Sequence, residues 1–544
     1  MTDQSPSASS HLLGEGLVAP ASGSLSAPVA VDTAGGRVQV RWDPDAQMTT
    51  MGQLVFFAEF VHASGWFEDL VQRCPLARTS PNAPGNRDVL GTVVLGTLSG
   101  AKRYAHLTGL RNDAVAGRWL GMSRVLSEDA VRRGMSALTA CGSATETWIN
   151  GALLASALPV LEQDWILDID VTVKPIFGHQ EGAVIGYNPH KPGRPSHAYH
   201  TYIVGGARLI LATEVRPGNE TSPSHGQAGL TRLMDALEPR QQPRLIRGDS
   251  AYGTDEDMLW CERRGLSYLF KMRQSAGIRQ LINEVSDVRF GQRTWKDAGQ
   301  GWEGLFIDHI LTSWFKGRRM AVIRRKIANP AEPKRRRKAL PSPDPTGAVQ
   351  TTFLPEIVPV GTETYEYAVL VTNLETNDIL TIAQLYRDRA DSENVNDELK
   401  NQWGWGGFTT ADLPRCALIA RLVALVYNWW RLFSMLVENG VSGREAITSR
   451  DRFLNAPARL TTSGGQRHLV IDPSHGDMAG ITQQLTRTAQ AINGIIRQAE
   501  QLAWAIPQRI AAVVRLALAR WLAPADGSSQ ATRMTLLLRA KCRI

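Results

Sequence analysis

Three acidic residues, far apart in the chain, constrain its fold more than any other feature. Asp170 lies in a strand-like stretch, Asp249 ends a second one, and Glu393 lies in a polar helical segment. Intervals of 79 and 144 residues separate them, so only a fold that brings distant segments together would let them act as one site. Converged carboxylates are a common way for proteins to hold the paired Mg²⁺ ions that act on phosphodiester bonds. The spacing therefore predicts a fold with a shared carboxylate site.

Length and composition indicate a soluble protein of more than one domain. The chain has 544 residues, of which 43% are hydrophobic and 21% charged, as in ordinary globular proteins. Its net charge of +8 favours a polyanionic partner such as nucleic acid, although charge alone leaves this open. Five cysteines without a CxxC pair favour a reducing compartment, and the first residues do not resemble a signal peptide. We expect a cytoplasmic protein.

Changes in composition and periodicity divide the chain into six segments. The first is rich in Ser, Ala, Pro and Gly, so we expect it to be disordered. The second contains helical stretches, either as a DNA-binding domain or as a packing domain with a solvated basic face. The expected segments are a disordered N-terminus (1–36), a helical domain (37–150), the first part of an α/β core (151–273), a β-rich insertion (274–372), the second part of the core (373–440) and a C-terminal helical region (441–544).

A change to period two at Trp165 indicates where a β-sheet begins. In the stretch 165–174, apolar residues alternate with Asp168, Asp170, Thr172 and Lys174. Further strands are expected at 183–187, 199–204, 208–215, 245–249 and 267–271, with helices at 230–237 and 255–264. Consecutive strands followed by alternating helices and strands predict an α/β fold with a mixed sheet.

The insertion and the C-terminal region have different patterns. We expect β-strands at 309–314, 320–324 and 365–372 of the insertion, which also carries the basic run 334–338. Helices should resume at Thr381, and the last hundred residues should be mostly helical. The apolar stretch 416–437 contains Arg421 and Arg431, and its longest uncharged run is too short to cross a bilayer.

Four polar residues fall on one face if the segment around Glu393 is a single helix. At about 100° per residue, Arg389, Glu393 and Lys400 lie at roughly 300°, 340° and 320° from Tyr386. A carboxylate between two cations suits a ligand that is both metal-bound and anionic. The alternative is an amphipathic helix with a charged solvent face.

The two aspartates also allow structural interpretations. Asp170 could lie on the wet face of an edge strand, although its apolar neighbours favour a central one. Asp249, which precedes Ser250, could be a turn residue or a helix cap. Side chains at strand ends are held rigidly, and this favours a catalytic role.

Taken together, these motifs resemble the signatures of bacterial insertion-sequence DDE transposases. The matching segments are Asp170-Val171-Thr172, Gly248-Asp249-Ser250-Ala251-Tyr252-Gly253 and Tyr386-x(2)-Arg389-x(3)-Glu393-x(6)-Lys400. The last is similar to the Y-(2)-R-(3)-E-(6)-K signature of one group of these enzymes, and the tract from Gly178 to Ser196 also resembles that group. The likeness extends over roughly residues 45 to 440.

The resemblance implies a ribonuclease-H-like core interrupted by a β-rich insertion. It implies that Asp170, Asp249 and Glu393 are both catalytic residues and metal ligands, with Mg²⁺ as the cofactor and Mn²⁺ as an alternative. Asp168 is the rival of Asp170, which we prefer because Thr172 completes an Asp-x-Thr pattern. Transposon-end DNA would be contacted by Tyr386, Arg389, Lys400, Lys191, Arg194 and Trp302. For Trp302, a place in the hydrophobic core is the alternative.

The implied reaction is cleavage at transposon ends, followed by attack of the freed 3′-hydroxyl on target DNA. Two Mg²⁺ ions about 3.5–4 Å apart would assist both steps. The expected partners are inverted-repeat ends and target DNA, bound by a homodimer near the nucleoid. Two other functions stay open, namely a catalytically silent DNA-binding protein derived from a transposase and a stand-alone nuclease of the same fold.

Overall fold

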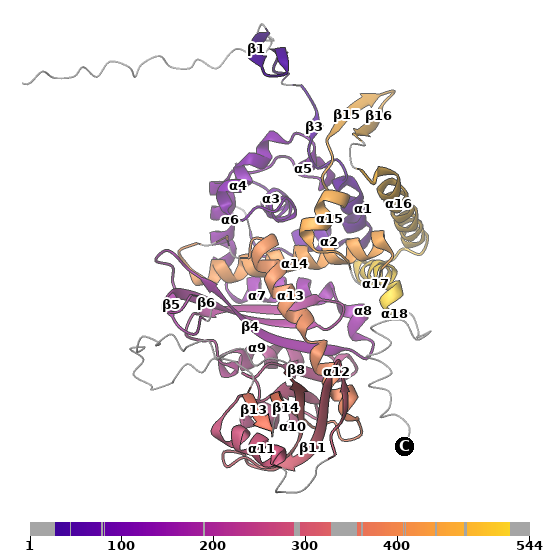
Figure 1. The fold of residues 1–544 in the computed structure, drawn as a ribbon. Helices are drawn as coiled ribbons and strands as arrows, with labels where there is room; N and C mark the ends of the chain where they lie inside the picture. Colours follow the sequence, from indigo (N-terminus) through magenta and orange to yellow (C-terminus); the bar gives the residue numbers. More distant parts are fainter. Residues whose placement is uncertain are drawn as a thin grey trace, which may run out of the picture.

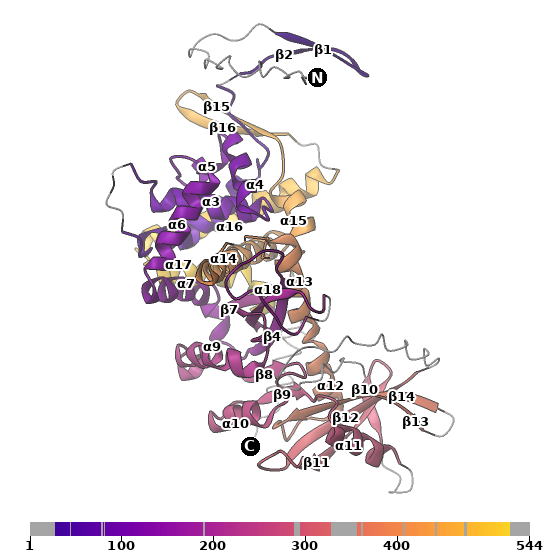
Figure 2. The same cartoon turned by 90° about the vertical axis from the view of Figure 1, so that its left-hand side faces the viewer.

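The computed structural model describes residues 28–522, except for positions 44, 78–79, 81, 189–190, 288–293, 328–355, 361–362, 406, 409, 441–442 and 473–475. A long mixed β-sheet extends from the middle of the molecule to one end, and most of the helices gather at the other end (Figure 1). The turned view shows the same arrangement, with β4 and β7 between the helices and the insertion strands (Figure 2). The predicted mixed α/β fold is confirmed.

Five strands form the centre of the sheet, in the order β7-β6-β4-β8-β9. β6 is antiparallel to β4 and β7, whereas β8 and β9 run parallel to β4. The bounds in this region are β4 (Ile166–Pro175), β5 (Val184–Ile185), β6 (Pro195–Val204), β7 (Leu209–Pro217), α9 (Pro223–Asp235), the 3₁₀ helix η2 (Pro239–Gln241), β8 (Leu245–Gly248), α10 (Asp255–Arg263) and β9 (Tyr268–Lys271). Every strand and helix expected between residues 165 and 271 overlaps one of these elements.

The strands of residues 274–372, the segment expected to be a β-rich insertion, extend this sheet rather than forming a separate one. The elements of this segment are α11 (Ala276–Ser286), β10 (Lys296–Gly299), β11 (Trp302–His309), β12 (Arg318–Lys326), β13 (Glu356–Val360) and β14 (Glu363–Thr372). β14 pairs with β9, and β12, β11 and β10 follow it in order. The expectation of a strand at 309–314 is wrong, because the strand comes earlier and the chain turns where Trp314 N donates to Leu311 O. The basic run 334–338 lies outside the described residues.

The helices from both ends of the chain pack around the long helix α14. Before the sheet come α1 (Leu54–Ser64), α2 (Trp66–Gln72), α3 (Asn86–Leu98), α4 (Tyr104–Gly109), the 3₁₀ helix η1 (Leu110–Asn112), α5 (Ala116–Trp119), α6 (Glu128–Ala140), α7 (Ser143–Ala155) and α8 (Leu158–Leu161). After the insertion come α12 (Ile379–Arg387), α13 (Ala390–Gln402), α14 (Leu413–Glu438), α15 (Ala446–Phe453), α16 (Met478–Gln501), α17 (Ile506–Ala517) and α18 (Ala519–Leu522).

Within the described residues, α14 is a helix long and apolar enough to cross a membrane, but its apolar window is entirely buried by the rest of the chain. The two arginines expected to interrupt it are buried with partners. Arg421 donates to Thr213 O and pairs with Glu146, and Arg431 donates to Gly443 O. The ion pair with Glu146 compensates the burial of the Arg421 charge, whereas Arg431 keeps two buried nitrogens without a partner in the described part of the chain. α14 is therefore the central core helix of the fold.

Two hydrophobic cores hold these elements together. The larger core joins α1–α7, the inner strands, α14, α16 and α17, so the helices from the two ends of the chain share it with the sheet. The smaller core lies between the insertion strands and α12 and includes Leu370, Ile379 and Leu385. Since α12 leads directly into α13, the second core fixes the approach to the segment that carries Glu393.

Two short hairpins differ from the sequence-based expectations. β1 (Val29–Thr33) and β2 (Gly36–Val40) pair within a segment expected to be disordered up to residue 36. Here the Thr33 hydroxyl donates to Gly36 O, and Gly36 adopts a φ of 110°, which glycine tolerates. Residues 1–27 lie outside the described part. β15 (Ala458–Ser463) and β16 (Gln466–Ile471) form a hairpin in a region expected to be mostly helical, and β15 also pairs with β3 (Met48–Thr49).

Candidate active site

Asp170 and Asp249 lie at corresponding positions of neighbouring parallel strands. In the register of β4 and β8, Ile169 is opposite Gly248, so the next residues are the two aspartates. Asp170 is 8% exposed, whereas Asp249 is half-buried. Asp249 follows the last residue of β8, and its Oδ1 accepts a hydrogen bond of 2.9 Å from Ala251 N. Asp249 therefore does have the turn role considered for it, and the strand register places it beside Asp170.

Arg389 lies between Asp170 and Glu393. Its Nη2 is 3.1 Å from Asp170 Oδ1, and its Nη1 is 2.9 Å from Glu393 Oε1. The guanidinium side chain is 4% exposed, and its Nε has no hydrogen-bond partner in the described part of the chain. A buried arginine between two carboxylates neutralises charges that would otherwise repel each other.

The pKa of Asp170 shows that the three carboxylates share one electrostatic environment. Burial raises the pKa of Asp170 to about 6, Arg389 opposes this rise, and the negative charges of Asp249 and Glu393 add to it. The fold therefore brings the three sequence-predicted acids into one neighbourhood. Glu393 is the most accessible of them, with 67% of its side chain exposed.

The segment around Glu393 is not the single helix assumed in the angle calculation. α12 ends at Arg387, α13 begins at Ala390, and the N–H groups of Arg389 and Ser392 bond to carbonyls three residues back. Hydrogen bonds of the 3₁₀ type therefore connect the two helices at this point. Tyr386 is half-buried against the smaller core, and burial raises its pKa. The solvent-face alternative is wrong for Arg389, which is buried.

Lys400 and Asn396 extend the site along α13. Lys400 Nζ donates to Thr172 Oγ1 over 2.8 Å, which joins the third signature to the Asp-x-Thr pattern. Asn396 is 3% exposed, and its Nδ2 donates to Asp170 Oδ2 over 2.9 Å. Sequence reasoning missed Asn396, although the same helical angle calculation would have placed it beside Arg389.

Asp168, the rival of Asp170, is held elsewhere. Its carboxylate is fully buried and accepts two hydrogen bonds from Arg247, at 2.6 and 2.7 Å. Arg247 also donates to Leu385 O, at the end of α12. Both oxygens of Asp168 are thus bound by charge-assisted hydrogen bonds from a buried arginine.

The carboxylates of Asp170, Asp249 and Glu393 are suitable ligands for a hard divalent cation. Their oxygens, however, do not converge on a single point where such a cation could bind. Within the described residues, no three His, Cys, Asp or Glu side chains lie close enough together to bind a metal ion. Arg389 instead supplies positive charge between Asp170 and Glu393. Carboxylate oxygens are the ligands that Mg²⁺ prefers. The residues therefore fit the metal if Arg389 yields its place to it.

Two cations expected to contact DNA lie on the loop before β6. Lys191 Nζ and Arg194 Cζ each lie 4.8 Å from the centre of the Phe177 ring, which is 70% exposed. Arg194 and Phe177 also line a surface hollow of about 510 Å³. The loop forms a basic and aromatic surface, and neither cation is paired with a carboxylate in the described part of the chain.

Trp302, the residue of the insertion expected to bind DNA, is half-buried at the start of β11. It packs against the smaller core, with Arg325 Cζ 5.0 Å from its ring centre. Because part of the ring is packed and part is accessible, the structure is compatible both with a DNA contact and with a place in the hydrophobic core.

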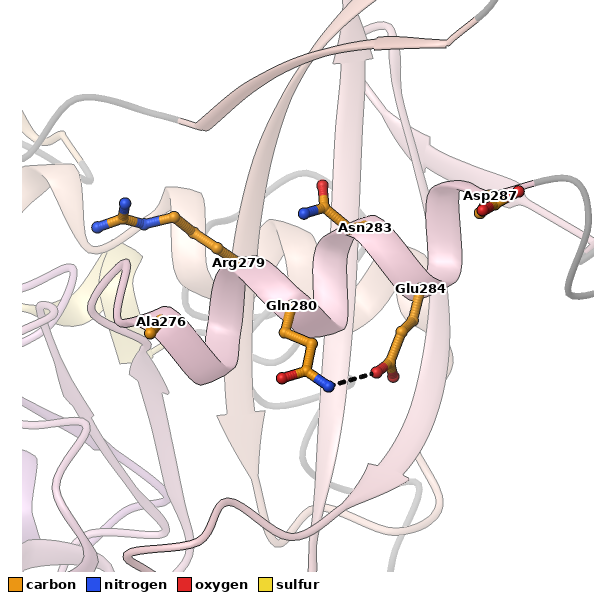
Figure 3. A pocket seen from close by; sticks show the side chains of 6 residues that line it. All are labelled: Ala276, Arg279, Gln280, Asn283, Glu284 and Asp287. Atoms are coloured by element: carbon orange, nitrogen blue, oxygen red, sulfur yellow. Dashed lines mark hydrogen bonds between the residues drawn. The ribbon is translucent and has the colours of Figure 1, made fainter.

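A second surface hollow lies over α11, on the insertion. Figure 3 shows the residues that line it along this single helix, where Gln280 Nε2 donates to Glu284 Oε1 over 2.9 Å. Asp170, Asp249 and Glu393 do not line it. It is an open helix surface and lacks the convergent groups of an active site.

Lys271, at the end of β9, is a site residue that sequence reasoning missed. Burial lowers its pKa, while the charges of Asp249 and Glu393 raise it. Nothing in the sequence distinguishes this lysine from other strand residues, because its position depends on the pairing of β8 with β9.

The chain is similar to a known protein family and to a solved structure. The sequence model of the family described as transposase DDE domain group 1 matches residues 33–491. No curated protein matches the chain. Among solved structures, it is similar to the cryo-EM structure of the piggyBac transposase synaptic complex with hairpin DNA, with a TM-score of 0.34, 10% sequence identity and coverage of 89% of this chain and 88% of that one. By the family match, which spans most of its length, this chain belongs to the DDE transposases and is a DNA transposase.

Proposed function

We propose that the protein cleaves the ends of its transposon and joins them to target DNA, with Asp170, Asp249 and Glu393 as the catalytic carboxylates. The observation that carries this proposal is the shared environment of the three groups. Asp170 and Glu393 bind the same guanidinium, and the charges of Asp249 and Glu393 both raise the pKa of Asp170. A buried carboxylate with a raised pKa, beside two further acids from distant segments, is typical of a functional site.

The same three residues would hold the divalent metal. DDE transposases use divalent ions, generally Mg²⁺, and Mn²⁺ is an alternative here. When bound, the ions would make the attacking oxygen more nucleophilic and stabilise the leaving oxygen. Arg389 would then leave at least one carboxylate and become available to DNA.

The reaction is two successive displacements at phosphorus. In the first, a water oxygen bonds to phosphorus while the bond to the 3′ oxygen breaks, which leaves a 3′-hydroxyl and a 5′-phosphate. In the second, that 3′ oxygen bonds to a target phosphorus and a target 3′ oxygen departs. The chain's own contribution is to position the DNA and to neutralise charge.

Cationic and aromatic residues around the carboxylates would hold the DNA. Tyr386, Arg389 and Lys400 lie next to the acids and would contact the transposon end. Lys191 and Arg194 would bind phosphates farther along, and Trp302 would offer the accessible part of its ring for stacking.

Four finer assignments belong to the same proposal. We assign the β7-β6-β4-β8-β9 arrangement to a ribonuclease-H-like core, and the spacing of Tyr386, Arg389, Glu393 and Lys400 to the bacterial insertion-sequence group with the Y-(2)-R-(3)-E-(6)-K signature. The helical domain at 37–150 would bind DNA, and a homodimer in the cytoplasm would hold the two ends.

A cleavage assay tests the proposal. The probe is a duplex with the terminal inverted repeat read from the DNA that flanks the gene, incubated with Mg²⁺ and a target plasmid. Asp249→Ala and Glu393→Ala should abolish cleavage and keep end binding, whereas Glu284→Ala on the α11 surface should leave both intact. Cleavage by either site variant would remove that residue from the proposed site.

The same assay separates the alternatives. End binding by the wild type without cleavage would indicate a silent DNA-binding protein. Cleavage without joined products would indicate a nuclease.

A further inference from the structure

Lys271 lies in the same row of the sheet as the two catalytic aspartates. Ile169 of β4 is opposite Gly248 of β8, which is opposite Phe270 of β9. The next residue in each segment is Asp170, Asp249 and Lys271, respectively. Since the segments are parallel and in register, side chains of one row point to the same side of the sheet. The sheet therefore presents two carboxylates and an ammonium group side by side.

The Lys271 ammonium group is close to the acids but bonded to none of them. The charges of Asp249, Arg389 and Glu393 all act on its pKa, so its end lies within their environment. In the described part of the chain it forms no hydrogen bond or ion pair. Its neighbours do have partners, since Arg389 is bonded to Asp170 and Glu393, and Lys400 is bonded to Thr172.

The Lys271 ammonium group is therefore available to a further anion. Lys271 is half-buried, and burial lowers its pKa. Its three N–H donors are nevertheless left unused beside the reaction centre. A salt bridge that only stabilised the fold would use them. An anion that arrives with the substrate would accept them, and the negatively charged group that the substrate brings to the reaction centre is the phosphate to be cleaved.

We propose that Lys271 is a further catalytic residue, which donates a hydrogen bond to a non-bridging oxygen of the scissile phosphate. This inference rests on the proposed function. The ammonium group acts as a compact point charge, and the negative charge on those oxygens grows as the attacking oxygen approaches. Lys271 would bind this charge from the side of β9. Arg389, which immediately precedes α13, and Lys400, which lies within α13, would approach it from the other side of the site.

Single-turnover cleavage of the same end duplex tests the inference with two variants and a control. Lys271→Gln should lower the cleavage rate by about 100-fold or more, as removal of a transition-state donor does. End binding should change by less than about 3-fold, because many other phosphate contacts remain. Lys271→Arg should recover part of the rate. Lys174→Gln removes a buried lysine of β4, 4% exposed, and should cleave like the wild type.

A neutral substrate distinguishes phosphate contact from a structural role. With a methylphosphonate at the scissile position, one charged oxygen is absent, so the cost of Lys271→Gln should fall to less than about 10-fold. The Mg²⁺ concentration for half-maximal binding, measured by calorimetry, should be unchanged or lower, because a repelling cation has been removed.

Each contrary result has a separate meaning. If Lys271→Gln lowered the cleavage rate equally on the phosphate and methylphosphonate substrates, or bound Mg²⁺ more weakly, Lys271 would be a structural residue. Either result would overturn the inference. Normal cleavage by Lys271→Gln would also overturn it and leave the proposed function standing. Absence of cleavage by the wild type would instead reject the proposed function.

Discussion

Replacing Arg389 by Gln should destabilise the metal-free protein strongly at pH 8 and weakly at pH 5. The substitution leaves the carboxylate of Asp170, 11% exposed, with Asn396 and a backbone N–H as its remaining donors. Removing one partner of a buried ion pair costs about 3–5 kcal/mol. Loss of the second ion pair, between Arg389 and the exposed Glu393, should add no more than about 0.5 kcal/mol to this cost.

The pH dependence follows from the raised pKa of Asp170. The folded protein holds the Asp170 proton up to about pH 6, above the usual value of about 4 for the unfolded chain. The folded state therefore binds more protons, and this group's contribution to stability falls as the pH rises from about 4 to 6. Without Arg389 the pKa rises further. At pH 5 both proteins carry a mostly protonated Asp170, and the loss should shrink to about 1 kcal/mol, the value of a hydrogen bond.

Urea unfolding in EDTA at the two pH values measures this difference. Arg515→Gln is the control, because its ion pair with Glu162 is exposed and its loss should stay below about 1 kcal/mol at both pH values. Mg²⁺ at ten times its dissociation constant should return about 1.4 kcal/mol to the Arg389 variant. An equal loss at pH 5 and pH 8, or a loss no larger than that of the control, would refute the reasoning.

Two further predictions concern the supports of the site. Arg247→Met should lower the free energy of unfolding by about 3–5 kcal/mol, because it strands the buried carboxylate of Asp168, and the double variant with Asp168→Leu should recover much of that loss in urea titrations. A double variant no more stable than the single one would contradict this. Lys400→Ala should make the logarithmic salt slope of end binding shallower by about 1 if Lys400 leaves Thr172 to bind a phosphate. An unchanged slope would exclude that contact.

The sequence predicted those parts of the fold that depend on local periodicity. The alternation around Asp170 gave the position of β4, and the expected elements between residues 165 and 271 are present. It could not predict where Arg247 would pair, because the partner of a buried aspartate depends on the register of β4 with β8. For the same reason it could not place Lys271 in the row of the two aspartates.

Other differences between the predicted and observed elements arose where tertiary contacts override the local sequence pattern. The angle calculation assumed one helix from Tyr386 to Lys400, but the chain tightens at Arg389, which forms a buried ion pair with Asp170 and a second ion pair with the exposed Glu393. Sequence alone does not specify such a pair. The run 309–314 has strand-like composition but forms a turn beyond β11, since the pairing of β11 with β12 ends at His309.

The central claim is that Asp170, Asp249 and Glu393 bind divalent cations together. Anomalous diffraction from crystals of the DNA-bound protein in Mn²⁺ tests it most directly. The account predicts a Mn²⁺ peak bound by Asp170 and Asp249, with Glu393 as a further ligand and Arg389 released from at least one carboxylate. A Mn²⁺ peak elsewhere, or no peak at saturating Mn²⁺ with Arg389 still bonded to both Asp170 and Glu393, would contradict it.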